Sequence, residues 1–465
     1  MNSSRQAKRL WNACSTALVD FPISDVSPIE YSTALPESVD VVIVGGGIVG
    51  ISAAIYLNRL GQRVVLLEKG RIAGEQSSRN WGWIRQQGRD PDELPIMVEA
   101  SHLWRELSAQ TDETIGLVQG GLTYMAKDSA EFEKFAAWMP HANENGVDSR
   151  MLSRAELEKL MPEARCNWSG GIYTASDMRA EPWVAVPTLA RLAVSEGVTI
   201  CEGCAARGIE TSAGQITAVM TENGIVKTPQ VIVAGGAWSS LFLRNAGVNI
   251  PQLSVRASVV AVDGAPMTYQ GGGADSKIAF RTRADGGYSL AAGEFHEFFI
   301  GPDAFRAFGK YLTQVKHDPF GTRYYPAAPK GYPDAWGTPR RWALDEQSPF
   351  ERMRVLNPKP NAAKCASLVD HFSALFPDLG PIKSKAAWAG MIDTMPDLVP
   401  VVDQVDDVSG LTIATGMSGH GFGIGPAIGR ILAKMVTGQD TGYDLSRFRL
   451  SRFSDGSKMV LGPAI

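Results

Sequence analysis

The sequence predicts an α/β protein in which a parallel-sheet domain, assembled from discontinuous segments, is combined with an α+β domain built on an antiparallel sheet. Three observations predict this fold class. A strand, a glycine turn, a helix and a second strand follow one another over residues 41–68. A further strand, glycine turn and helix fill residues 412–438, and residues 255–300 alternate apolar and polar side chains between them.

A chain of 465 residues is too long for one ordinary core, so we expect more than one domain. The boundaries follow the change from glycine-turn patterns to alternating ones. We expect an N-terminal arm at 1–38, a nucleotide-binding domain from 39–115, 170–252 and 386–465, and a substrate domain from 116–169 and 253–385 with a lid or insertion at 301–345.

The first glycine pattern is a dinucleotide fingerprint in a complete Rossmann-like βαβ unit. Gly45 permits the tight turn after the apolar run 41–44, Gly47 lets a pyrophosphate approach the backbone, and Gly50 lets helix and strand pack closely. The helix start offers unpaired N–H groups and a positive dipole end to phosphates. Glu68 ends the second strand, where it can accept hydrogen bonds from ribose hydroxyls. An ordinary glycine-rich turn would leave Glu68 unexplained.

The later elements follow from shorter signals. Apolar spacing predicts a helix at about 96–110, and Ser153-x-x-Glu156 is typical of a capping box at a helix start. Asn223-Gly224 between alternating segments predicts a β-hairpin. Residues 301–345 are rich in proline and aromatic side chains and have little periodicity, which indicates a functional lid, an insertion or a flexible flap.

Composition excludes several classes of function. A net charge of −4 provides no basic field for nucleic acid, and no apolar run is long enough for a membrane span. Five cysteines, an odd and small number, favour reduced thiols in a reducing compartment such as the cytoplasm. Cys201 and Cys204 form a CxxC without a second ligand pair, so we expect no metal site.

Four segments in a fixed order make the chain resemble a known family. They are VVIVGGGIVGISAAIYLNRLGQRVVLLEKG, SSRNWGWIR, VIVAGGAWS, and a tail with Trp388-x-Gly390, MPDLVPVV and GMSGHGFGIGPAIG. With them the chain resembles FAD-dependent oxidoreductases of the D-amino-acid-oxidase-like superfamily, nearest the glycine oxidase, sarcosine oxidase and γ-glutamylputrescine oxidase branch. A plain NAD-dependent dehydrogenase is a weaker alternative, because such enzymes lack the last three segments.

The resemblance implies a set of FAD contacts. The fingerprint and the end of the second strand would hold the diphosphate and adenosine ribose, the SSRNW segment would lie beside the ribityl chain and flavin, and the last glycine turn would approach the flavin pyrimidine edge. The implied residues are Gly45, Gly47, Ile48, Val49, Gly50, Glu68, Lys69, Ser77, Ser78, Arg79, Asn80, Trp81, Ala206, Ala234, Gly235, Gly236, Trp238, Gly390, Gly419, His420, Gly421, Phe422 and Gly423. Backbone dipoles at the flavin would stabilise the charge that develops as hydride arrives.

Departures from the family pattern shape the functional expectation. Gly390 stands where some sarcosine oxidases attach FAD to a cysteine, which implies non-covalent FAD. Ile392 stands where glycine oxidase has an arginine that binds the substrate carboxylate. Arg85 aligns instead with the arginine of a monomeric sarcosine oxidase motif and is the candidate ligand for a substrate anion, unless it is a surface arginine.

Three further positions concern catalysis. Ala291 replaces the oxygen-activating lysine of the family, so either another lysine, with Lys277 as a weak candidate, or a different electron acceptor is implied. Tyr288 is a candidate for substrate positioning, together with lid aromatics that could equally be packing residues. His296 is a candidate active-site residue or a structural histidine, and His420 more a loop-shaping hydrogen bonder than a base.

These points predict an FAD-dependent amino acid or amine oxidase or dehydrogenase. Hydride leaves the C–N carbon of a bulky or N-substituted substrate to give an imine, water yields a carbonyl product and an amine, and O2 is reduced to H2O2. The alternatives are a dehydrogenase that passes electrons to a quinone or protein acceptor and a partner-dependent flavoprotein subunit. The sequence leaves the oligomeric state open.

Overall fold

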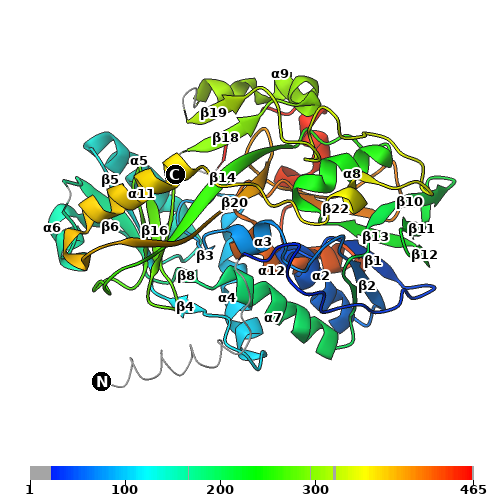
Figure 1. Ribbon diagram of the computed structural model, residues 1–465, viewed down its shortest axis with the longest axis horizontal. Helices are drawn as coiled ribbons and strands as arrows, with labels where there is room; N and C mark the ends of the chain where they lie inside the picture. Colours follow the sequence, from blue (N-terminus) through cyan, green and yellow to red (C-terminus); the bar gives the residue numbers. More distant parts are fainter. Residues whose placement is uncertain (1–21, 166, 294, 318–320, 463–465) are drawn as a thin grey trace.

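Two sheets dominate the computed structural model, which describes residues 22–165, 167–293, 295–317 and 321–462. The sheet with parallel strands occupies the right half of Figure 1, and the larger, mostly antiparallel sheet extends across the left half. Strands and helices from both ends of the chain meet where the two halves join. The predicted α/β class is confirmed at this level.

The six-stranded sheet gathers distant parts of the chain. Its centre is β1 (Val41–Val44), paired in parallel with β2 (Val64–Leu67) and β13 (Gln230–Val233). It continues through β9 (Thr199–Cys201) on one side and β22 (Leu411–Thr415) on the other, and β21 (Val401–Gln404) is an antiparallel edge. All of β1 except half-buried Val44, and all of β2, is buried, so these strands are continuous apolar runs, as expected for a covered parallel sheet.

Four helices pack together against this sheet, as Figure 1 shows: α2 (Ile48–Arg59), α4 (Leu94–Ala109), α7 (Pro182–Ser195) and α12 (Gly421–Val436). The contact between α2 and α12 is very close. A Cβ on Gly429 would lie 2.6 Å from the backbone nitrogen of Ala53, and one on Gly425 would lie 2.7 Å from Ile48 Cγ1. Glycine at these two positions therefore allows the C-terminal helix to lie directly on the fingerprint helix.

The second sheet is organised around two long strands, β14 (Leu253–Asp263) and β20 (Lys383–Thr394), which pair antiparallel from Leu253↔Thr394 to Asp263↔Lys383. Its other strands are β5 (Leu122–Ala126), β6 (Ser149–Ser153), β7 (Gly170–Thr174), β15 (Gly272–Ala274), β16 (Ala279–Thr282), β17 (Tyr288–Ala291), β18 (His296–Phe299) and β19 (Thr322–Tyr325). The alternation over 255–300 thus correctly predicted antiparallel strands. β7 and β20, which we assigned largely to the nucleotide domain, pair into this sheet instead.

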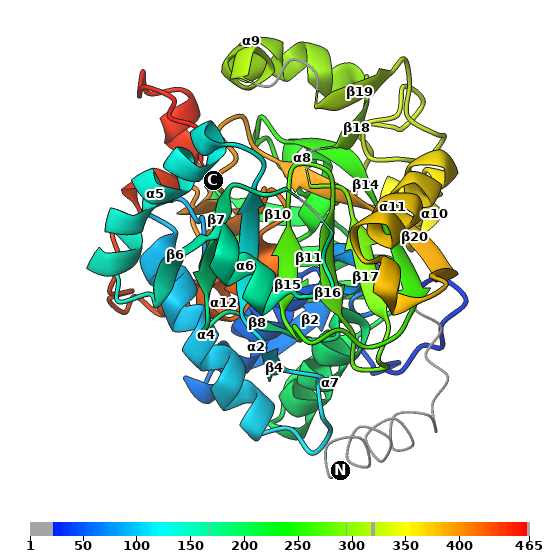
Figure 2. The ribbon, with the colours of Figure 1, turned by 90° about the vertical axis from the view of Figure 1, so that its left-hand side faces the viewer.

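Figure 2 shows the helices α5 (Ser129–Glu144), α6 (Arg154–Leu160) and α11 (Ala362–Leu375) around the antiparallel sheet. The predicted capping box is present: Ser153 N donates to Glu156 Oε2 at 2.8 Å, and α6 begins at the next residue. The predicted hairpin joins β11 (Gln215–Thr221) to β12 (Gly224–Lys227), with β10 (Ala206–Ser212) beside them. Its turn is Glu222-Asn223, one residue before the predicted pair, because Gly224 already pairs with Thr221.

Short elements complete the described fold. A small sheet consists of β3 (Trp83–Ile84), β8 (Met178–Arg179) and β4 (Val118–Gln119). The remaining helices are α3 (Gln76–Arg79), α8 (Ser239–Asn245), α10 (Pro349–Arg352) and the 3₁₀ turns Gly236–Trp238, Pro377–Leu379, Ser446–Phe448 and Leu450–Phe453. Within the described residues, no helix combines the length and apolar character needed to cross a membrane.

The arm residues from 22 to 38 pack on the parallel-sheet half. Ile23 is buried and its carbonyl accepts from Arg79 Nη2 at 2.9 Å, while Ser32 and Ser38 form bridges with Cys201 and Lys227. The rest of the expected arm, residues 1–21, lies outside the described residues.

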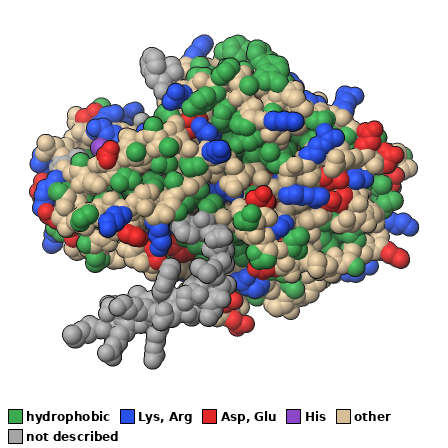
Figure 3. Space-filling view, viewed as in Figure 1, with side chains coloured by type: hydrophobic (Ala, Val, Ile, Leu, Met, Phe, Trp, Pro, Cys, Tyr) green, Lys and Arg blue, Asp and Glu red, His purple; other side chains and the backbone are tan. Residues whose placement is uncertain are grey.

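The segment 301–345 is less irregular than its sequence indicated. It contains the 16-residue helix α9 (Pro302–His317) and the edge strand β19, which continues the large sheet beside β18. Apolar side chains of α9 face solvent, with Phe305 67% and Phe308 63% exposed. α9 lies at the top of Figure 1, and hydrophobic atoms gather at the top of Figure 3, which has the same view. The aromatic and proline content concealed the helix, because its apolar residues follow a helical period only over 302–317.

We expect Gly429→Ala to destabilise the protein, because the added methyl group would meet the α2 backbone. The predicted loss is about 1–3 kcal/mol, seen as a lower melting temperature and a lower content of bound cofactor. Gly309→Ala in α9 is the matched control, since a Cβ there meets no atom within 4 Å. An unchanged melting temperature for Gly429→Ala would contradict the close helix contact.

Candidate FAD site

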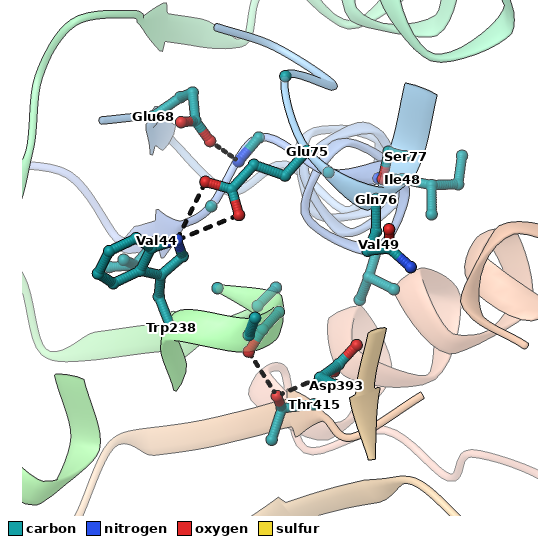
Figure 4. Close-up of a pocket in the computed structure, with 18 of the residues that line it drawn as sticks. Val44, Ile48, Val49, Glu68, Glu75, Gln76, Ser77, Trp238, Asp393 and Thr415 are labelled. Atoms are coloured by element: carbon teal, nitrogen blue, oxygen red, sulfur yellow. Dashed lines mark hydrogen bonds between the residues drawn. The ribbon is translucent and has the colours of Figure 1, made fainter. Parts of the chain in front are cut away.

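One cavity lies at the carboxyl ends of the parallel strands, where ligands bind in open α/β sheets (Figure 4). It encloses about 1270 Å³, part of it open to solvent. Its lining includes distant parts of the chain: the fingerprint turn, the segment from the end of β2 to residue 80, Ala206, the turn after β13, Phe350 and Arg354, Asp393, and the end of β22 with the start of α12.

The fingerprint glycines allow close backbone contacts at the turn. Gly45 has φ +114°, and a Cβ there would overlap the carbonyl oxygen of Ala234, while a Cβ on Gly50 would overlap the carbonyl oxygen of Gly45. A Cβ on Gly47 would lie 3.0 Å from Ser77 Oγ. The start of α2 lies at the cavity wall, where the Ile48 amide donates to Ser77 Oγ at 2.9 Å, and a helix N-terminus in such a place suits a diphosphate.

Glu68 lies at the end of β2 and holds the backbone around the turn. Its Oε2 accepts from Gly46 N and its Oε1 from Gly70 N, both at 2.8 Å. Removal from water raises the pKa of Glu68 to about 7, more than the nearby Lys69 and these amides lower it. The contact of Glu68 with ribose hydroxyls stays a prediction.

A second acidic residue faces the same cavity across from Trp238. Glu75 Oε1 accepts from Trp238 Nε1 at 3.0 Å and from Lys69 Nζ at 2.6 Å, and the Lys69 ammonium lies 4.6 Å from the Trp238 ring centroid. Figure 4 shows Glu68 and Glu75 on one side of the cavity and Thr415 with Asp393 on the other. The Glu75–Lys69–Trp238 group therefore joins the 68–75 segment to the turn after β13.

The opposite wall is the turn that leads from β22 into α12. Asp393 at the end of β20 accepts from Gly416 N at 2.7 Å and from Met417 N at 3.2 Å. The backbone then turns through left-handed conformations at Ser418, φ +49°, and Gly419, φ +86°. The first turn of α12 consequently starts at the cavity, so a second helix N-terminus faces the same space as α2.

These features fit FAD. An elongated cavity with a helix start at each of two walls and an acid for the ribose suits a dinucleotide whose diphosphate and flavin both accept hydrogen bonds. The residues that would hold it are the Gly45–Val49 turn and Glu68 at the adenosine diphosphate, and the Gly419–Phe422 turn at the flavin.

Most of the cofactor contacts implied by the resemblance line this cavity. They are Gly45, Gly47, Ile48, Val49, Glu68, Lys69, Ser77, Asn80, Ala206, Ala234, Gly235, Gly236, Trp238, Gly419, Gly421 and Phe422. Seven others lie outside the described cavity lining: Gly50, Ser78, Arg79, Trp81, Gly390, His420 and Gly423.

The seven support the wall from behind. Arg79 is 2% exposed and donates to backbone carbonyls of Ile23, Gly74 and Ala389, so it fastens segments together. A Cβ on Gly390 would overlap Gln76 Oε1, which leaves no space for a cysteine side chain without rearrangement. A Cβ on Gly423 would lie 3.3 Å from Ile84 Cα, and its carbonyl accepts from Trp104 Nε1 at 2.9 Å.

The sequence analysis missed several lining residues. Among them are Glu75, Gln76, Phe350, Arg354, Asp393, Thr415 and Met417. Glu75 and Gln76 immediately precede the SSRNW segment, so extending that segment by two residues would have included them. Phe350 and Arg354 follow a long irregular segment and carried no signal of their own.

The three candidate catalytic residues do not meet in one place. Tyr288 is fully buried beside Phe372, donates to the carbonyl of Ala265 at 2.6 Å and accepts from Met267 N at 3.0 Å. Its hydroxyl is therefore used within the core of the antiparallel domain, and we correct its assignment to a packing residue. His296 lies on β18 near the edge of the sheet, outside the cavity lining.

Arg85 has a different environment from a surface arginine. It is 7% exposed, donates through Nη1 to the carbonyl of Gln87 at 2.6 Å, and stacks with its guanidinium carbon 5.2 Å from the Tyr124 ring centroid. It follows β3, whose backbone presses on Gly423 in the first turn of α12. Arg85 thus lies behind the flavin end of the candidate site.

We expect Glu68→Gln to separate cofactor binding from apoprotein stability. Because the folded pKa of about 7 exceeds the ordinary 4.5, ionisation of Glu68 lowers apoprotein stability as pH rises from about 4.5 to about 7. The variant lacks this loss, so it should match wild type at low pH and exceed it in stability above about pH 7. Its FAD affinity should fall about tenfold, since a charge-assisted acceptor is lost.

The measurements are urea unfolding of the apoprotein at several pH values and quenching of FAD fluorescence. Glu210→Gln, an exposed site on β10, is the control. Equal FAD affinity in the Glu68 variant and wild type would exclude Glu68 from the ribose site.

Comparison with known proteins agrees with this site. The family model for FAD dependent oxidoreductases matches residues 40–435. An L-amino acid deaminase from Proteus myxofaciens, solved in complex with anthranilate, has 31% identity and a TM-score of 0.88, over 93% of this chain and 97% of its own. An N-methyl-L-tryptophan oxidase from Salmonella typhimurium is 26% identical over 423 residues, covering 89% of this chain and 99% of that protein.

The mitochondrial sarcosine dehydrogenase of Mus musculus is 28% identical over 248 residues, which are 52% of this chain and 27% of that protein. The chain thus matches about a quarter of the dehydrogenase. The predicted cofactor is confirmed as FAD rather than NAD by the family that matches. The match over most of the chain, together with a fingerprint turn and a C-terminal helix start on one cavity, shows that the protein belongs to the FAD-dependent oxidoreductase family.

Proposed function

We propose that the protein oxidises the C–N bond of an amino acid, with preference for a bulky or N-substituted one. FAD, when bound, accepts hydride from the carbon that carries the nitrogen. The substrate leaves as an imine, which water hydrolyses to a carbonyl compound and an amine. The chain's own residues bind and orient the substrate, and no strong side-chain base is required if the amine is bound in its neutral form.

The observation that carries this proposal is the buried position of Arg85. The Arg85 guanidinium is 7% exposed and donates through Nη1 to the carbonyl of Gln87, which keeps its other donors available for a carboxylate. Arg89 lies four residues later, is 3% exposed, and its Nη1 has no hydrogen-bond partner among the described residues. Two buried cations beside the flavin end of the site favour an anionic substrate.

The relatives support the substrate class. The names of the two relatives that match along their whole length refer to L-amino acids and N-methyl-L-tryptophan. Ile392, where glycine oxidase has its carboxylate-binding arginine, lies 3.9 Å from a Cβ built on Gly419. The turn Gly419–Phe422, called the flavin turn below, thus has an apolar side chain beside it. This leaves Arg85 as the carboxylate ligand and favours a substrate with an apolar part. Non-covalent FAD follows from Gly390 and the Gln76 side chain against it.

The electron acceptor has two candidates. Dioxygen is the first, with H2O2 as its product. Ala291, at the position of the family lysine, is 2% exposed in β17 and pairs with Val259, while Lys277 is exposed on the turn between β15 and β16. Because neither supplies a cation at the flavin, a dehydrogenase that reduces a quinone or a protein, or a flavoprotein subunit that depends on a partner, is the second candidate.

Arg85→Ala should raise KM about 10- to 100-fold for carboxylate substrates, since a charge-assisted, bidentate contact is lost. FAD content should stay unchanged, because Arg85 is outside the cofactor cavity. Amines without a carboxylate should show the same KM in variant and wild type. Arg341→Ala, at an exposed position, is the control. An unchanged KM for carboxylate substrates would remove Arg85 from the substrate site.

An anaerobic screen of amino acids and amines, followed by the loss of flavin absorbance, tests the substrate class. We expect faster bleaching with aromatic or N-methyl amino acids than with glycine. Comparison of H2O2 formation in air with reduction of an artificial dye then identifies the type of acceptor. Glycine as the best substrate would contradict the proposed preference, and failure of every amine to bleach the flavin would favour the partner-dependent subunit.

A further inference from the structure

A second polar cluster lies behind the flavin turn and is not used by the proposed reaction. Glu93, the residue before α4, is 1% exposed, and neither of its carboxylate oxygens has a hydrogen-bond partner among the described residues. His420, the residue before α12, has Nδ1 3.5 Å from Glu93 Oε2, and this Nδ1 also lacks a partner. The two residues that start α4 and α12 therefore face each other through unpartnered atoms.

An unpartnered buried carboxylate beside an unpartnered ring nitrogen is costly, on the order of 1–3 kcal/mol for each group. One proton between them removes both costs, because a carboxylic acid donates to the nitrogen of a neutral imidazole. We propose that Glu93 and His420 share one buried proton, held on Glu93 and donated to His420 Nδ1, and that this bond positions the 418–421 turn against the flavin. Glu93 and His420 are positioning residues in this role.

The surroundings favour this proton placement over an ion pair. Arg85 and Arg89 face both groups, and together with burial they lower the pKa of His420 well below its ordinary value. Burial is the largest influence on Glu93 and raises its pKa to about 7, against the opposing effect of Arg89, Arg85 and Arg447. Burial thus acts against an imidazolium on His420 and favours a protonated carboxyl on Glu93.

Acidic neighbours raise the pKa of Glu93, as burial does. Asp397 and Asp90 face it from two different loops, and both are close to Arg447, at 3.2 Å and 3.6 Å respectively. Asp177, which accepts from Gln86 N at 2.7 Å, balances part of the charge on Arg85. Because Arg447 and Arg85 already interact with these carboxylates, they lower the pKa of Glu93 by less than burial raises it.

The turn is otherwise fixed from the side of Asp393, which accepts from Gly416 N and Met417 N before the glycine. Trp104 Nε1 donates to the carbonyl of Gly423 after it, at 2.9 Å. Between these two attachments, His420 lies against Glu93 at the start of α4, and the Phe422 ring centroid lies 5.0 Å from that of Trp104 in α4. The inference depends on FAD binding alone and on no particular substrate.

The test compares Glu93→Gln, Glu93→Leu and His420→Leu, with Glu106→Leu at an exposed position of α4 as the control. The Gln side chain keeps a neutral donor for Nδ1, so FAD affinity of the apoprotein should stay within about threefold of wild type. Glu93→Leu removes the donor and should weaken FAD binding about tenfold. The effects of Glu93→Leu and His420→Leu should not add in the double variant.

A pH series distinguishes a shared proton from packing alone. The flavin midpoint potential is measured from about pH 5.5 to about pH 8.5, a range that brackets the raised pKa of Glu93. Above about pH 7 wild type gains a negative charge behind the turn that Glu93→Gln cannot gain, so its potential should fall below that of the variant. Titration of Glu68 affects both proteins equally and cancels in the difference.

Three results would overturn the inference: a constant difference in potential across the pH series, equal FAD affinities for Glu93→Gln and Glu93→Leu, or additive losses in the double variant. If Glu93→Leu fails to fold, the pH series with Glu93→Gln decides by itself. None of these readouts uses a substrate, so they stay independent of the proposed reaction.

Discussion

The contact between α2 and α12 determines the geometry of the whole site. Gly425 and Gly429 let α12 lie on the fingerprint helix with the Gly429 Cα close to the backbone of Ala53. Since both helices start at the cavity, their contact brings two helix N-termini to one ligand. A larger residue at either glycine would separate the helices and move the flavin turn away from the diphosphate turn.

The cavity wall is held by polar groups that bridge segments distant in sequence. Glu68 fastens the fingerprint turn, Glu75 joins Lys69 and Trp238, and Asp393 holds the start of the flavin turn. Glu68 and Asp393 bond mainly to backbone amides and Glu75 bonds to Lys69 and Trp238, while burial still raises the pKa of Glu68 and of Asp393. This arrangement allows a polar cofactor site to be built mostly from backbone, with few side chains that must be of one type.

The antiparallel sheet contributes to the site through β20. This strand runs along β14 for most of its length and ends at Asp393, directly beside the flavin turn, and its Gly390 lies against Gln76 of the 71–80 segment. The antiparallel sheet is therefore joined through β20 to the turn that leads into α12. Buried Arg85 and Arg89 lie at the same junction, and a substrate between the halves would meet a cation and the flavin together.

The sequence by itself determined the βαβ unit and the antiparallel character of 255–300, because glycine spacing and strand alternation are local signals. Its resemblance to a family also pointed to many of the residues that line the cavity. It also singled out Arg85 as a candidate substrate ligand through a short motif, and this assignment stays a prediction. Helix α9 was missed because its period is confined to 16 residues inside an irregular segment.

Only the tertiary structure decided which segments pair and which side chains meet. It placed Tyr288 in a hydrophobic core, assigned β7 and β20 to the antiparallel sheet, and brought Glu93 against His420. A single sequence could not show this, since burial, strand partners and the pairing of polar atoms depend on contacts between residues tens to hundreds of positions apart.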